Sequence, residues 1–204
     1  MLTAFTAGLL LITISELGDK TFFIAVILAM KHSRKLVFIG VTAALAAMTI
    51  LSVLFGQIVS LLPQTYVKYA EIVLFFAFGM KLLYAASKMS GSSCETEVNE
   101  AKEAVEKAEL QTKVKTPLAI LIEAFTLTFV AEWGDRTQIA TIALAASYNT
   151  VGVAAGAVLG HAICTAIAVI GGKLIAGRIS ERQLTFAGGC LFLIFGIVAA
   201  VEGV

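Results

Sequence analysis

The stretch Glu16-Leu-Gly-Asp-Lys-Thr21 recurs as Glu132-Trp-Gly-Asp-Arg-Thr137, 116 residues further along the chain. Other residues coincide at the same offset, and one inserted residue extends the match into the third apolar stretch of each half. The matched pairs include Gly40 and Gly156, Thr49 and Thr165, Gly56 and Gly172, and, after the insertion, Gly79 and Gly196. Self-similarity over this length is typical of a duplicated structural unit.

The residues around both motifs are strongly apolar. Hydrophobic residues make up 59% of the 204-residue chain and charged residues 14%, with a mean hydropathy of +0.93. A soluble domain carries about 25% charged residues, and a membrane helix needs about 20 mostly apolar residues. Six stretches are long enough, at about 2–30, 36–60, 68–87, 117–146, 150–173 and 184–203. The sequence therefore predicts an all-α integral membrane protein with six transmembrane helices.

The first and fourth stretches carry the two motifs near their middle and are longer than a bilayer requires. A helix of about 30 residues would reach about 45 Å, against a hydrocarbon core of about 30 Å. Gly18 and Gly134 weaken helical structure inside the motifs. We therefore expect both helices to break there and to free backbone carbonyl oxygens for a cation.

A charged segment at residues 88–116 separates the first half, residues 1–87, from the second, residues 117–204. Glu103 and Lys107 form a favourable i,i+4 pair, which indicates a solvated and partly helical linker. Eleven Lys and Arg residues flank the spans on the side of this linker and one flanks them on the other. The positive-inside rule predicts a cytoplasmic linker and both termini on the opposite side. Since each half has three spans, we expect two inverted three-helix repeats.

Four carboxylates lie at membrane depth, where each costs about 2.5–3.5 kcal/mol. They are Glu16, Asp19, Glu132 and Asp135. Glu and Asp at i,i+3 share one helix face, and a two-fold relation between the halves can bring both pairs together. We predict that all four bind one divalent metal ion. An oxygen cage suits Ca²⁺, Mn²⁺ or Mg²⁺ better than Zn²⁺ or Cu⁺.

Other polar residues of the motifs are expected to support the site. They are Ser15, Lys20, Thr21, Arg136, Thr137 and Gln138. The four carboxylates with Lys20 and Arg136 leave a net charge of −2, which one divalent ion or two protons would neutralise. This balance favours exchange of metal for protons, with the metal as transported substrate and no resident cofactor. The chain's net charge of +1 indicates no nucleic-acid partner.

The duplicated motif Glu-x-Gly-Asp-(Lys/Arg)-(Thr/Ser) resembles that of a small cation transporter family. This family includes Golgi manganese and calcium transporters and bacterial and cyanobacterial manganese exporters. The resemblance covers both halves and implies export of Mn²⁺, or else Ca²⁺, from the cytosol in exchange for H⁺. It also implies that the four motif carboxylates bind the ion. The expected location is an inner or plasma membrane, or a thylakoid or other organelle membrane.

Several alternatives remain open at the level of sequence. A divalent-cation channel or uniporter could use the same carboxylates as a selectivity ring. Intramembrane aspartyl proteases also carry membrane aspartates, but here Glu replaces the first Gly of their motif, which disfavours an enzyme. A structural subunit has little use for four midplane carboxylates, although Lys20 and Arg136 could simply form buried ion pairs with them.

Three further expectations concern residues outside the motifs. His161 aligns with Leu45, so the repeat supports a packed, hydrogen-bonded histidine rather than a ligand, with a proton-relay or gating role as the alternative. Glu71 and Glu123 are expected to extend towards water from helix ends. The glycines at positions 152, 156 and 160 form a small-residue stripe, which indicates a contact between helices.

Overall fold

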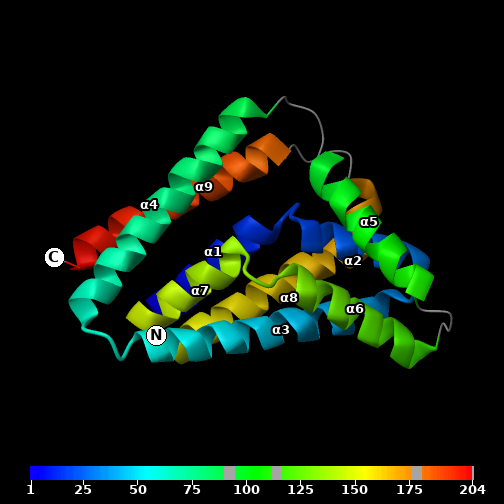
Figure 1. Cartoon of the computed structure of the whole chain (residues 1–204), viewed down its shortest axis with the longest axis horizontal. Coiled ribbons are helices and arrows are strands. Elements are labelled where there is room, and N and C mark those ends of the chain that lie inside the picture. Colours follow the sequence, from blue (N-terminus) through cyan, green and yellow to red (C-terminus); the bar gives the residue numbers. More distant parts are fainter. Residues whose placement is uncertain (90–94, 112–115, 176–180, 204) are drawn as a thin grey trace.

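The computed structural model describes residues 1–89, 95–111, 116–175 and 181–203, and these residues form nine α-helices without a β-strand among them. Figure 1 shows their arrangement. Their bounds are α1 (Leu2–Glu16), α2 (Lys20–Lys31), α3 (Arg34–Val59), α4 (Gln64–Lys88), α5 (Glu95–Gln111), α6 (Pro117–Ala131), α7 (Arg136–Ser147), α8 (Thr150–Ile175) and α9 (Glu181–Gly203). The predicted all-α class is confirmed.

Four helices, α3, α4, α8 and α9, are long and apolar enough to cross a membrane. Helices α6 and α7 count as a fifth span if they are taken together, with a bend of 75° between them. The first predicted span, residues 2–30, consists of the shorter helices α1 and α2. A span of about 30 Å needs about 20 helical residues, so neither α1 nor α2 can cross alone.

Both motif helices break where the sequence predicts. Helix α1 ends at Glu16 and α2 begins at Lys20, while α6 ends at Ala131 and α7 begins at Arg136. The glycine inside each break has a left-handed backbone, with φ of 80° at Gly18 and 82° at Gly134. Only glycine adopts this region without a steric cost, so the glycine of each motif fixes the place of the break.

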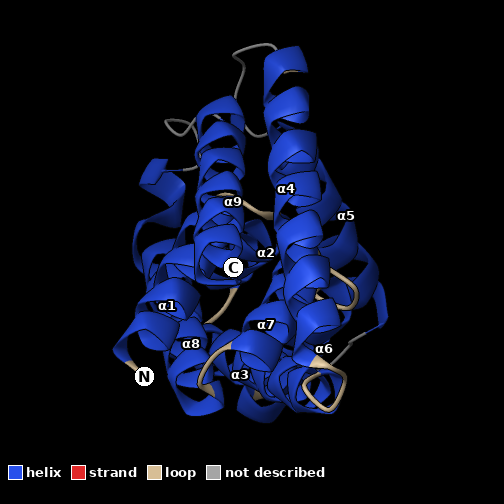
Figure 2. Cartoon of the chain, turned by 90° about the vertical axis from the view of Figure 1, so that its left-hand side faces the viewer, coloured by secondary structure: helices blue, strands red, loops and turns tan. Residues whose placement is uncertain are grey.

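Glycines also set the closest helix contacts. Gly156 on α8 lies against the backbone of Phe5 and Leu9 on α1, which confirms the predicted role of the small-residue stripe. Gly40 on α3 lies in the same way against Leu121 and Phe125 on α6. Helices α4 and α9 pack against each other and lie side by side in both views (Figures 1 and 2). Because glycine has no Cβ, the backbones of the paired helices approach closely enough at these glycines for van der Waals contact.

The linker helix α5 is less solvated than predicted. Its Glu103 and Lys107 form the expected ion pair at 2.6 Å on an exposed face. Its other face, however, packs on α2 (Figure 1), and Ala101 and Val105 are fully buried there. The apolar side chains of α5 recur at helical spacing, and this stripe docks the linker on the helix bundle.

The prediction that Glu71 extends to water is wrong. Glu71 lies one to two turns inside α4 and is only 3% exposed. Glu123 on α6 is half-buried. The prediction failed because α4 begins at Gln64, four residues before the expected start of this span, so Glu71 is not at a helix end. It lies on the buried face of α4, with Val67 and Phe75.

Candidate metal site

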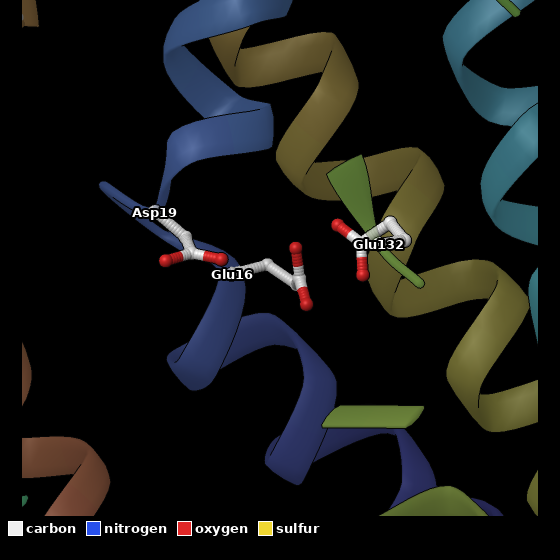
Figure 3. A group of neighbouring side chains, drawn as sticks. All are labelled: Glu16, Asp19 and Glu132. Carbon is white, nitrogen blue, oxygen red and sulfur yellow. The ribbon is translucent and has the colours of Figure 1, made fainter. Parts of the chain in front are cut away.

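Three motif carboxylates from the two halves converge at the breaks between the half-helices. One oxygen each from Glu16, Asp19 and Glu132 lies within 4.8 Å of the others. Figure 3 shows the Glu16 carboxylate between the other two, facing Glu132. Oxygen atoms at such separations can share one cation, because Ca²⁺ and Mn²⁺ hold several oxygen ligands at little more than 2 Å.

The two glutamates are buried and incompletely hydrogen-bonded. Glu16 is 2% exposed and Glu132 3%. The Thr21 hydroxyl donates to Glu16 Oε2 at 3.2 Å and also lies close to Glu132, while Thr137 lies close to Glu16. The Oε1 atom of each glutamate has no hydrogen-bond partner among the described residues. Buried carboxylate oxygens without partners are costly, and a bound cation would satisfy them.

Arg136 makes the main ionic contact across the two halves. Its Nη2 atom donates to Asp19 Oδ1 at 3.2 Å and to the Ser15 carbonyl oxygen at 3.3 Å. The helix break after Glu16 leaves carbonyl groups of α1 without an intrahelical partner. A carboxylate and a helix C-terminal carbonyl attract a cation, and in this conformation the guanidinium of Arg136 occupies that position.

The two motifs are not equivalent in this structure. Arg136 reaches across to the first motif, whereas Lys20 bonds outward to Glu100 of α5 at 3.2 Å. Asp135 lies outside the group of three carboxylates and caps α7, accepting from the backbone N–H of Thr137 at 3.2 Å. Gln138 accepts from the backbone N–H of Gly134 at 2.7 Å and so holds the second break in shape.

A cavity of about 210 Å³ adjoins Asp19 and Arg136. We call it the access cavity; it lies between the break in the first motif, the end of α4 that precedes the linker, and the start of α9. Its charged lining residues are Asp19, Arg136, Lys81 and Glu97. The sequence gives no sign of Lys81 and Glu97 as cavity residues, because neither belongs to a motif and Glu97 lies in the segment predicted to be solvated.

Three further polar side chains, Cys164, Thr165 and His161, lie near the site without joining it. Cys164 and Thr165 on α8 line a small cavity beside Glu16 and Thr21. His161 is 5% exposed, and its Nδ1 atom has no hydrogen-bond partner in the part of the chain that is described. The repeat does identify Thr165, which pairs with Thr49. It gives no corresponding signal for His161.

Replacing Gly134 should show how much the break depends on glycine. An added Cβ would meet nothing within 4 Å, so backbone strain is the only expected cost. We expect Gly134→Ala to lower the free energy of unfolding by about 1–2 kcal/mol. Gly134→Asn should lose less, because asparagine tolerates this region better. Thermal unfolding of the purified protein measures both; an equal loss would contradict a strain-based cost.

The chain matches known proteins along nearly its whole length. The family model for GDT1, described as a divalent cation/proton antiporter, matches residues 4–90 and 120–204. The GDT1-like protein sll0615 of Synechocystis sp. is 60% identical over 200 residues, which cover 98% of this chain and 97% of that protein. GDT1-like protein 3 of Arabidopsis thaliana is 45% identical over 197 residues, which cover 92% of this chain and 67% of that protein. The protein PAM71-homolog, chloroplastic, of Arabidopsis thaliana is 42% identical over 207 residues, which cover 95% of this chain and 58% of that protein. No solved structure was found to match the chain.

Proposed function

Because the chain belongs to the GDT1 family of divalent cation/proton antiporters, we propose that it carries Mn²⁺ out of the cytosol in exchange for protons, with Ca²⁺ as the next candidate substrate. The observation that carries this proposal is the convergence of Glu16, Asp19 and Glu132 from both motifs. The atoms that these side chains offer to a metal are all oxygens, and the carbonyl oxygen of Ser15 lies near Asp19, since both bond Arg136. Hard oxygen ligands favour Mn²⁺ and Ca²⁺ over thiophilic metals.

Charge balance supports exchange for protons. Without a metal, the four motif carboxylates outnumber the two motif cations, of which Lys20 is paired with Glu100 away from the site. Uncompensated negative charge in a membrane interior is costly, so either protons or a divalent cation must occupy the carboxylates. Protons and the metal ion then compete for the same carboxylates, and this competition couples the movement of one to the movement of the other.

We further propose that the six predicted spans form two inverted repeats, residues 1–87 and 117–204. Equivalent contacts support a two-fold relation between these halves. Gly40 meets Leu121 and Phe125, and the residues 116 positions away along the repeat meet in the same way, Gly156 with Phe5 and Leu9. Likewise Gly79 lies against Leu193 and Gly196 against Phe76. A two-fold axis produces such reciprocal contacts, and alternating access commonly uses inverted repeats.

The proposed orientation places the linker, residues 88–116, in the cytoplasm and both termini on the opposite side. The excess of Lys and Arg beside the linker supports it. In this orientation the access cavity, which lies beside the end of α4 and the start of α9, faces the cytosol. Relatives from a cyanobacterium and from chloroplasts suggest a plasma, thylakoid or chloroplast membrane.

Proton movement measured together with metal movement tests the proposal. The full chain is reconstituted into vesicles that enclose a pH-sensitive dye, and Mn²⁺, Ca²⁺ or Mg²⁺ is added outside. We expect saturable metal uptake with proton release from the vesicle lumen, at the lowest concentrations for Mn²⁺. Metal uptake without proton movement would instead indicate a channel or uniporter, and no uptake of any of the three ions would reject the proposal.

A further inference from the structure

Arg136 occupies a position that suits the transported cation. Its guanidinium bonds the Asp19 carboxylate and the Ser15 carbonyl, while Glu16 and Glu132 lie beside Asp19. The hydrogen bonds of the arginine are incomplete, because its buried Nε atom has no hydrogen-bond partner among the described residues. A metal ion that binds Asp19 must therefore displace Arg136, and the displaced charge needs another carboxylate.

Glu97 is the second carboxylate that lines the access cavity, after Asp19. It lies on α5 and lines the cavity together with Asp19 and Arg136. Its charge also acts on Arg136. Arg136 thus shares one cavity with an acidic group of the motif, which it bonds, and an acidic group of the linker.

The linker helix is fixed where it presents Glu97. One turn further on, Glu100 bonds Lys20 of the first motif at 3.2 Å. Ala101 and Val105 are fully buried against the bundle, so α5 cannot turn without exposing apolar surface. Lys81 of α4 is the second cation that lines the access cavity.

We propose that Arg136 competes with the transported metal for Asp19, and that Glu97 of the linker helix holds Arg136 when the metal takes its place. Glu97 is then a positioning residue that acts through Arg136 and raises the fraction of protein able to bind metal. This inference rests on the proposed function, since it needs a divalent cation at Asp19. The apparent dissociation constant rises as the competent fraction falls, so Glu97 and Arg136 should affect it in opposite directions.

Metal affinity can be read directly in the full chain, because Trp133 is its one tryptophan and follows Glu132. We titrate Mn²⁺ into the purified protein in lipid nanodiscs and follow quenching of Trp133 fluorescence. Glu97→Gln should weaken Mn²⁺ binding about five- to tenfold, and Arg136→Gln should tighten it. Glu97→Asp should restore most of the affinity. The matched control is Glu106→Gln, an exposed carboxylate on the same helix beside Lys31 and Lys102, which should change nothing.

The double variant decides whether Glu97 acts through Arg136. In the Arg136→Gln background, Glu97→Gln should have no further effect, because no arginine remains to be held. The same loss in both backgrounds would overturn the proposal and show that Glu97 merely attracts cations. If Arg136→Gln does not fold, the salt dependence of the Glu97→Gln effect on Mn²⁺ affinity decides. Attraction across water is strongly screened at about 0.5 M salt, so an effect that disappears there would overturn the proposal. An effect that persists supports competition inside the site.

Failure of this inference differs from failure of the proposed function. If the wild type binds Mn²⁺ and Glu16→Gln does not, but Glu97→Gln binds like the wild type, only the role of Glu97 is rejected. If the wild type binds neither Mn²⁺ nor Ca²⁺, the proposed transport function fails with it.

Discussion

Replacing Glu16 by glutamine should reduce divalent-cation transport by at least about 100-fold. The change removes the central carboxylate of the three that converge and keeps the size of the side chain. Loss of a group that merely supports a metal ligand already costs about 10- to 100-fold, so loss of a ligand should cost at least as much. Metal uptake by vesicles that contain equal amounts of wild type and variant measures the effect.

The same substitution should leave the fold intact. Glu16 is 2% exposed, and a buried carboxylate without full compensation destabilises a membrane protein. Without metal, Glu16→Gln should therefore unfold at the same temperature as the wild type or a higher one. Glu123→Gln is the matched control, because Glu123 is a half-buried carboxylate of α6 outside the group of three. Equal transport by wild type and Glu16→Gln would show that the motif carboxylates are structural.

Among the glycines whose contacts the structure describes, Gly156 should cause the largest loss of stability when it is replaced by alanine. The new Cβ would collide with the carbonyl group of Phe5 and crowd the backbone of Leu9, and backbone atoms cannot move aside as side chains do. We expect a loss of about 2–3 kcal/mol in the free energy of unfolding. This loss comes despite the roughly 1 kcal/mol by which alanine favours a helix over glycine.

Thermal unfolding in detergent, with Gly188→Ala as control, checks this expectation. A Cβ at Gly188 would meet only Leu82 at 3.8 Å, an ordinary contact, so that variant should be as stable as the wild type. Gly40→Ala should behave like Gly156→Ala, because its Cβ would meet the Leu121 carbonyl at 2.8 Å. A stable Gly156→Ala protein would contradict the close approach of α1 and α8.

Features that follow from local backbone chemistry could be predicted from the sequence. Both helix breaks lie at the motifs because Gly18 and Gly134 adopt positive φ, and this requirement is visible in the residue type. The small-residue stripe likewise predicted the contact made by Gly156. In each case a glycine carries the information without reference to distant residues.

Features that depend on tertiary contacts could not be predicted in the same way. The two motifs match in sequence, yet Arg136 bonds Asp19 while Lys20 bonds Glu100. Because the motifs match, the sequence cannot reveal this asymmetry. It arises because matching residues of the two halves have different surroundings in this conformation. The docking of α5 was also missed, although Val98, Ala101 and Val105 form an apolar stripe, because the many charges of the linker dominated its interpretation.

The central claim is that carboxylates from both motifs form one shared metal site. Calorimetric titration of Mn²⁺ into the purified wild type, Glu16→Gln, Glu132→Gln and the double variant tests it most directly. We predict one ion per wild-type chain, loss of that ion in either single variant, and no further loss in the double variant. Two ions per chain, with each single variant keeping one at full affinity, would contradict a shared site and assign a separate site to each motif.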